Sequence, residues 1–216
     1  MFENGFTETS TPNHVSLDTP ETLVRFGLTS KTELRFTPPD YFYNFNTGRG
    51  YGSGFGDLSF GVKQQLFATP SGFDASLIVQ LSVPTGASII SSHGYDPQVL
   101  LPWSRTISKN WTAAGMFSFF APTENGSHDP TGQASFYIDR QITSRSDAFV
   151  EYGGEFEQHS GPQHIIHVGA SLRITNNQQL DFHAGWGLSP AAVSRFVGFG
   201  YSFEFQAFHR EKRSGS

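Results

Sequence analysis

The segment from Arg195 to Phe205, RFVGFGYSFEF, constrains the fold of this chain more than any other stretch. Its large apolar residues alternate with glycine, serine and glutamate, and only Phe196 breaks the pattern. Because successive side chains of a strand point to opposite faces, the segment predicts a strand with one aromatic face and one small, polar face. Large residues outward and glycines inward suit a barrel in lipid better than a soluble sandwich, whose outward face is polar.

The same alternation recurs along most of the chain, most clearly from Asp57 to Phe67 and from Asp74 to Pro84. About twelve such segments are separated by connections that strictly alternate short and long. We therefore expect an all-β fold: an antiparallel, up-and-down transmembrane β-barrel of the outer-membrane type. Met1 to Glu8 is expected as the first strand, followed by a polar loop. A soluble sandwich or closed barrel is the alternative, because its core would use the same apolar parity.

Composition supports strands and excludes several classes of function. Glycine and phenylalanine are abundant, at 23 and 22 residues, and only 15% of the chain is charged. A net charge of −5 without clustered Lys and Arg provides no surface for nucleic acid. The chain has no cysteine, which excludes disulfides, thiol chemistry and thiolate metal sites. We expect neither a metal nor a cofactor.

The length is that of a single domain, which we expect to span residues 1–205 and to be followed by a polar tail, residues 206–216. No apolar run approaches the roughly 18 to 20 residues of a transmembrane helix, but barrel strands need only about 9 to 11. The first residues, MFEN, have neither the basic nor the apolar region of a signal peptide. We infer from this that the amino terminus is truncated.

Ionisable residues concentrate on the parity opposite to the apolar one. Such groups are tolerated in a membrane segment where they pair or meet water, so we expect them to line the lumen. They form either a salt-bridge network that fills and stiffens the barrel or two opposing walls, basic and acidic, of a polar permeation path. The first interpretation is favoured because long side chains leave a narrow barrel little room. The lumen-lining candidates are Arg25, Glu33, Arg35, Asp57, Lys63, Asp139, Glu151, Glu155, His167, Arg173, Asp181, His183 and Glu204.

An aromatic stretch lies between Pro38 and Gly54, which the prolines and glycines predict to be a long loop. It is a candidate ligand-binding loop, because convergent aromatic side chains offer stacking faces to an apolar solute. The favoured alternative is an aromatic girdle at the membrane interface. Its aromatic residues are Tyr41, Phe42, Tyr43, Phe45 and Tyr51.

Nothing in the sequence indicates a catalytic centre or a metal centre. The histidines show no metal-ligand spacing, and we expect His14 and His93 in solvated loops. An acyl hydrolase would need a nucleophile next to a base, yet no G-x-S-x-G elbow is present and the apolar parity offers no histidine in mid-strand. An enzyme remains the weaker alternative, because the fold alone does not exclude it.

Two stretches, PETLVRFGLTSKTELRF from Pro20 to Phe36 and GFGDLSFGVKQQLF from Gly54 to Phe67, carry a family resemblance. Together they resemble the meta-pathway phenol-degradation family of outer-membrane transporters. The matching positions are Arg25-Phe26-Gly27-Leu28, Glu33-Leu34-Arg35, and Gly54-Phe55-Gly56-Asp57 with Gly61 and Lys63.

The resemblance implies a porin-like barrel in the bacterial outer membrane that carries small hydrophobic or aromatic compounds. Its expected partners are outer-membrane lipid, those solutes and the barrel assembly machinery. The closing strand also resembles that of outer-membrane barrels, which finish on an aromatic residue, whereas here residues 206–216 follow Phe205. A structural barrel with a charge-plugged lumen is the alternative to a transporter.

Overall fold

The structure, a computed structural model, describes residues 1–45 and 52–205. These residues form strands joined by turns and loops, and none of their segments is a helix that could cross a membrane. The strands are β1 (Phe2–Thr11), β2 (His14–Thr19), β3 (Leu23–Gly27), β4 (Thr32–Thr37), β5 (Tyr41–Phe45), β6 (Gly54–Phe55), β7 (Leu58–Ala68), β8 (Phe73–Val83), β9 (Asp96–Ser108), β10 (Trp111–Phe120), β11 (Thr123–Glu124), β12 (Ser127–His128), β13 (Thr131–Gln141), β14 (Ser146–Glu157), β15 (Gln163–Thr175), β16 (Gln178–Gly187) and β17 (Arg195–Phe203).

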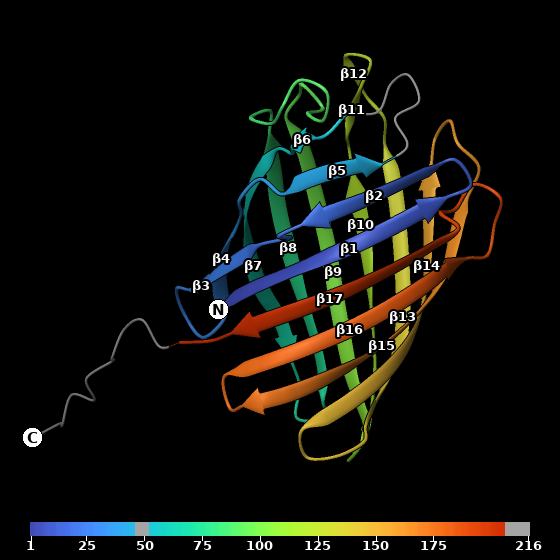
Figure 1. The fold of residues 1–216 in the computed structure, drawn as a ribbon. Helices are drawn as coiled ribbons and strands as arrows, with labels where there is room; N and C mark the ends of the chain where they lie inside the picture. Colours follow the sequence, from blue (N-terminus) through green and yellow to red (C-terminus); the bar gives the residue numbers. More distant parts are fainter. Residues whose placement is uncertain (46–51, 206–216) are drawn as a thin grey trace, which may run out of the picture.

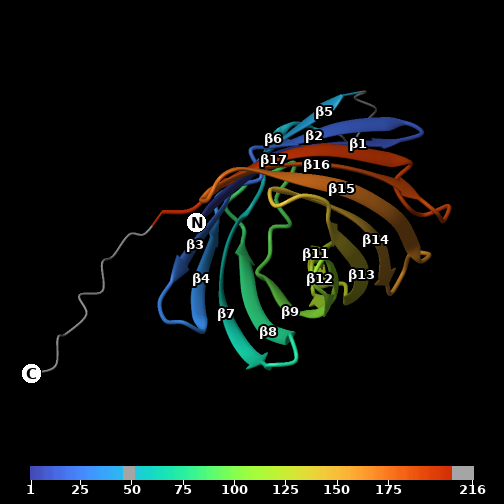
Figure 2. The ribbon, with the colours of Figure 1, turned by 90° about the horizontal axis from the view of Figure 1, so that it is seen from below.

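All strands except the β11–β12 hairpin belong to one antiparallel sheet that closes on itself (Figures 1 and 2). Closure is made by β1 and β17, which pair from Phe2 with Phe203 to Ser10 with Arg195. A closed barrel leaves no sheet edge unpaired, which is the condition for a sheet to span lipid. The strand that most constrained the sequence interpretation is therefore the one that completes the ring.

Three strands of the wall are interrupted, and each is built of two labelled segments. Segments β2 and β3 form one wall strand, and both pair with β1. Segments β5 and β4 form the next, in which β5 pairs with β2 and β4 with β3. Segments β6 and β7 form the third, in which β6 pairs with β5 and β7 with β4. The interruptions fall at residues 20–22, 38–40 and 56–57, which contain three prolines and a glycine. Proline has no N–H for the sheet ladder, so a ladder breaks there. With these segments joined, the described residues form twelve wall strands.

The alternation of residues gives the two faces of the wall different side chains. Apolar side chains on the outward parity are exposed, for example Phe117 at 59%, Phe182 at 54% and Val79 at 52%. The opposite parity carries glycine, serine and charged residues toward the interior. This is the inside-out arrangement of a barrel in lipid, and it confirms the predicted fold class.

Several sequence-based boundaries were wrong. The first strand runs to Thr11 rather than Glu8, and β2 occupies His14–Thr19, where a polar loop was expected. The first connection, Pro12–Asn13, is short although it lies at the long-loop end, so short and long connections do not strictly alternate. His14 is thus a strand residue. Residues 7–11 of β1, TETST, alternate polar with polar and so hide the period, whereas β2 is only six residues long and has two apolar residues, Val15 and Leu17.

The expected loop from Pro38 to Gly54 contains a strand, β5, over Tyr41–Phe45. The two prolines end β4, but the aromatic residues that follow are strong strand formers and resume the wall. Tyr51 lies outside the described residues, as does the tail expected at residues 206–216.

Candidate functional site: the lumen

The candidate site is the interior of the barrel, and the register of the strands decides which side chains face it. Glu3 forms an ion pair with Arg25, and both follow the parity of Gly200 and Gly198 on the neighbouring strands. Extending that parity around the ring places eleven of the thirteen lumen-lining candidates on the inner face, and a twelfth, Asp57, borders a cavity together with the inward Phe42. The exception is Glu204, which follows the end of β17 and is exposed.

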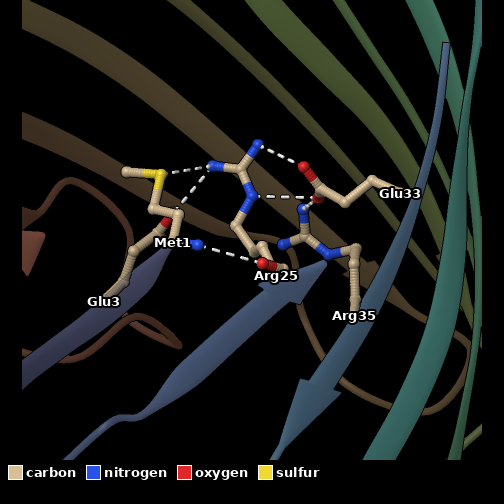
Figure 3. A network of polar contacts seen from close by, with 5 residues as sticks. All are labelled: Met1, Glu3, Arg25, Glu33 and Arg35. Carbon is tan, nitrogen blue, oxygen red and sulfur yellow. Dashed lines mark hydrogen bonds and ion pairs between the residues drawn. The ribbon is translucent and has the colours of Figure 1, made fainter. Parts of the chain in front are cut away.

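A cluster of ion pairs joins β1, β3 and β4 inside the barrel (Figure 3). Arg25 donates to both carboxylate oxygens of Glu33, at 2.9 Å from Nε and 2.8 Å from Nη2. Its Nη1 donates to Glu3 at 2.7 Å, and Arg35 Nη1 reaches Glu33 at 3.3 Å. A bidentate arginine–carboxylate pair fixes geometry as well as charge. Two arginines and two carboxylates thus neutralise one another.

Lys63 lies next to this cluster, since it pairs in register with Glu33 across β4 and β7. Its ammonium group forms no hydrogen bond or ion pair with the described residues. Arg35 is only partly satisfied, because its buried Nε finds no acceptor among those residues. Lys63 is therefore the cation of this wall that is left for a solute or water.

Carboxylates line the wall formed by β13 to β16. Asp139, Asp147, Glu151 and Asp181 border a cavity of about 480 Å³, together with Tyr137, Phe149 and His183. Ser171 donates to Asp147 at 2.6 Å, and Glu151 lies 2.9 Å from Nδ1 of His167. Among residues 1–45 and 52–205, no lysine or arginine lines this acidic cavity. The cavity is a polar hollow with an aromatic side.

The ion-pair cluster and the acidic cavity lie on opposite sides of the ring. β4, which carries Arg35, is six wall strands away from β14, which carries Glu151, and Figure 2 shows the two strands facing each other across the barrel. A salt-bridge network therefore exists but is confined to one wall, and the acidic cavity lies on the opposite wall. The carboxylates of the other wall form no ion pair with it at contact distance.

Aromatic rings and imidazoles pack beside the acidic cavity, which Phe149 and His183 border. The ring of His167 lies 5.1 Å from Phe149, 5.0 Å from His183 and 5.2 Å from Phe196, centroid to centroid. A side chain at Gly185 would collide with Phe196, and one at Gly198 would collide with His183. The inward glycines therefore make room for these large rings, which is one use of the small-residue parity.

Asp57 holds the loop formed by residues 84–95 at the mouth. It accepts hydrogen bonds from the backbone of Gly86 at 2.8 Å and Ser92 at 3.0 Å, and from the Ser91 hydroxyl at 3.1 Å. Burial would raise the pKa of this carboxyl group, but these hydrogen bonds outweigh burial and hold the pKa below its usual value. Asp57 thus acts as an ionised anchor.

The anchored loop packs on the inner face of the barrel. A side chain at Gly54 would collide with Ala87, and Gly54 pairs with Phe42 on the inner face. Ile89 and Ile90 of the loop border a second cavity of about 480 Å³ with Asp40, Phe42 and Asp57. The loop therefore narrows the mouth.

The candidate aromatic residues divide between the two faces of β5. Tyr41, Tyr43 and Phe45 share the outward parity, and Tyr41 packs against Tyr43 and Phe55, at 4.4 and 5.0 Å between centroids. This placement is that of an aromatic girdle. Phe42 faces the mouth cavity, so it is the described member of this set that a solute would meet.

Sequence reasoning missed several lumen residues. Asp147, Tyr137 and Phe149 line the acidic cavity, and the inward position of Phe196 was signalled by its break in the alternation. His164 lies on the outer face near the start of β15, and its Nδ1 is 2.7 Å from the Tyr152 hydroxyl.

Comparison with known proteins agrees with this architecture. The model of the family described as "Putative MetA-pathway of phenol degradation" matches residues 5–205. No curated protein matches the sequence.

Three solved structures are similar over nearly the whole chain. The COG4313 outer membrane channel from Pseudomonas putida F1 is 13% identical with a TM-score of 0.73, and 94% of each chain is covered. The NanC porin is 11% identical with a TM-score of 0.67, covering 95% of this chain and 100% of the porin. The KdgM porin is 10% identical with a TM-score of 0.63, covering 94% and 99%. At such identities the likeness shows the fold, which is that of outer-membrane β-barrel channels.

Proposed function

We propose that this chain, which belongs to the family described as "Putative MetA-pathway of phenol degradation", is a channel through the outer membrane for small, partly apolar solutes. The family description suggests aromatic compounds as the solutes. The observation that carries the proposal is the polar, hollow lumen inside a wall whose outer face is apolar. A barrel with a solid ionic plug would not need the acidic cavity.

The lumen offers both kinds of contact that a small aromatic solute requires. Charged and hydroxyl groups line the path, and Phe42 at the mouth and Phe149 beside the acidic cavity supply apolar faces. Pockets for small molecules combine such apolar walls with a few convergent polar groups. A small aromatic solute therefore keeps hydrogen-bond partners for its polar groups as it passes through the lumen.

Transport is tested by osmotic swelling of liposomes that contain the purified protein, with phenyl β-glucoside as a neutral aromatic solute that crosses lipid slowly. We expect swelling above that of empty liposomes and of liposomes that hold the heat-unfolded protein. Equal swelling in all three preparations, with no ion conductance in planar bilayers, would refute the channel and favour the structural barrel.

A further inference from the structure

The charged groups that face the lumen are overwhelmingly acidic. On the inner parity of the wall strands, the cations are Arg25, Arg35, Lys63 and Arg173. The carboxylates on the same parity are Glu3, Asp18, Glu33, Asp74, Asp96, Asp139, Asp147, Glu151, Glu155, Glu157 and Asp181. The interrupted positions of the wall add Glu21, Asp40 and Asp57.

Most of the cationic charge is already used. Arg25 and Arg35 are held by Glu33 and Glu3 in the ion-pair cluster, and Arg173 lies exposed near the short turns. Ion pairs of this kind cancel at a distance, so the cluster contributes little net field along the path. Of the described residues, Lys63 is the cation that remains for a solute in the interior.

The cavities show which charges a solute meets. Besides the acidic cavity and the mouth cavity, three more cavities of about 360, 330 and 470 Å³ are bordered by inward residues. Lys63 borders the last of them, and no other lysine or arginine of the part of the chain that the structure describes borders any of the five. The carboxylates that border them are Glu3, Glu21, Asp40, Asp57, Asp74, Asp139, Asp147, Glu151, Glu155 and Asp181.

Resting on the proposed channel function, we infer that the lumen is cation-selective and that its aromatic solutes are neutral or cationic rather than anionic. One sign of charge along a narrow path with low-dielectric walls concentrates ions of the opposite sign and repels ions of the same sign. Protonation of crowded carboxyl groups would make them neutral, not positive, so it weakens this preference without reversing it.

The inference separates two classes of aromatic compound. A phenol has a pKa near that of tyrosine, about 10, and is uncharged at pH 7, whereas a carboxylic acid with a pKa of about 4 is an anion. The lumen therefore admits phenols and aromatic amines and disfavours aromatic carboxylates.

The first test is the reversal potential of the reconstituted protein in a planar bilayer under a KCl gradient. We expect K⁺ to be at least about threefold more permeant than Cl⁻. A ratio of one or below overturns the inference while leaving the channel intact. Absence of any conductance removes the channel itself, so the two failures are distinguishable.

The second test replaces the ions by aromatic ones with permanent charge. Liposomes that contain the protein should swell faster in benzyltrimethylammonium chloride than in sodium benzenesulfonate, by about threefold or more. Equal rates, or faster swelling in the sulfonate, contradict the assigned solute class.

Conservative variants test which carboxylates are responsible for the cation selectivity. The triple variant Asp139→Asn, Asp147→Asn and Asp181→Asn removes three charges from the acidic cavity at nearly constant volume and should lower the K⁺/Cl⁻ ratio by about twofold or more. Glu8→Gln is the matched control, because Glu8 faces outward, in register with Val197, and the ratio should not change. An unchanged ratio in a triple variant that still shifts on a heat-modifiability gel would overturn the assignment to this cavity.

Discussion

The wall of the barrel has two halves that differ in regularity and in charge. The wall strands β8–β10 and β13–β17 are long and uninterrupted and pair with one another over eight or more residues, and carboxylates, imidazoles and aromatic rings face the lumen. From β1 to β7, three strands are interrupted, and this half holds the ion-pair cluster of Arg25 and Arg35.

This difference shows that one closed sheet can combine strands of regular alternation with strands that are interrupted. In the regular half, the alternation with a period of two is sufficient to specify the strands and their faces. In the interrupted half, backbone hydrogen bonds are lost at the prolines, and the ion pairs of Arg25 and Arg35 connect neighbouring strands instead. The outcome is a lumen that has an ion-pair cluster in its interrupted half and an acidic cavity without a basic partner in its regular half.

The largest expected effect is on the lipid face of either half. Val168→Arg in the regular half and Val62→Arg in the interrupted half should each lower the free energy of unfolding by about 2 to 4 kcal/mol, because both side chains face outward. Reversible unfolding in lipid vesicles measures it. Ser171→Arg is the control, since its charge would lie beside Asp147, and should cost less. Equal costs on the two parities would refute the assigned facing.

The ion-pair cluster should contribute the next largest effect. Arg25→Met leaves Glu3 without its partner and Glu33 with Arg35 alone, so we expect a loss of about 2 kcal/mol in the free energy of unfolding. Arg173→Met is the matched control in the regular half, where the exposed guanidinium has no ion pair with the described residues, and should cost less than about 0.5 kcal/mol. Similar losses would remove the proposed contrast between the halves.

A smaller effect is expected at the mouth. Asp57→Asn weakens the hydrogen bonds to residues 84–95, which should cost about 1 kcal/mol and make this loop more sensitive to added protease. Glu124→Gln, in the exposed β11–β12 hairpin, is the control and should leave cleavage of the loop unchanged. Identical cleavage of parent and Asp57→Asn protein would show that Asp57 is not the anchor.

The same anchor predicts a pH dependence. The folded-state pKa of Asp57 is depressed, so its stabilisation is complete above the unfolded value, about 3.9, and is lost as pH falls through the folded value. Protease sensitivity of the loop should therefore rise in the parent below about pH 4, with an acid-active protease. The Asp57→Asn protein should show no such step, and a step of equal size there would assign it to another group.

The smallest effects should separate the two faces of β5. Phe42→Ala widens the mouth cavity and should raise the swelling rate in phenyl β-glucoside, while Tyr43→Ala, on the outer face, should leave that rate unchanged. A change with Tyr43 and not with Phe42 would reverse the assigned faces.

The regular half could be predicted almost completely from its sequence. In β17 the alternation determines the strand, its faces and its place as the closing strand, and it even marks Phe196 as inward. The family resemblance, carried by residues on both sides of the first interruptions, was confirmed by the match over residues 5–205.

The interrupted half could not be predicted in the same way. Short segments such as His14–Thr19 have too few apolar residues to show a period, and prolines that end β4 looked like the start of a long loop. The inward charges could be named from parity, but their separation into a neutralised cluster and an acidic cavity depends on which strands face each other across the ring. Sequence spacing does not contain that information.

The most direct test of a water-filled lumen lined by the polar parity is cysteine scanning of β14, which the absence of native cysteine makes unambiguous. Val150→Cys, Glu151→Cys, Tyr152→Cys and Glu155→Cys are reconstituted singly in liposomes and treated with a charged, water-soluble thiol reagent. The account predicts rapid labelling at positions 151 and 155 and protection at 150 and 152, which face lipid. Labelling at 150 and 152 with protection at 151 and 155 would contradict it.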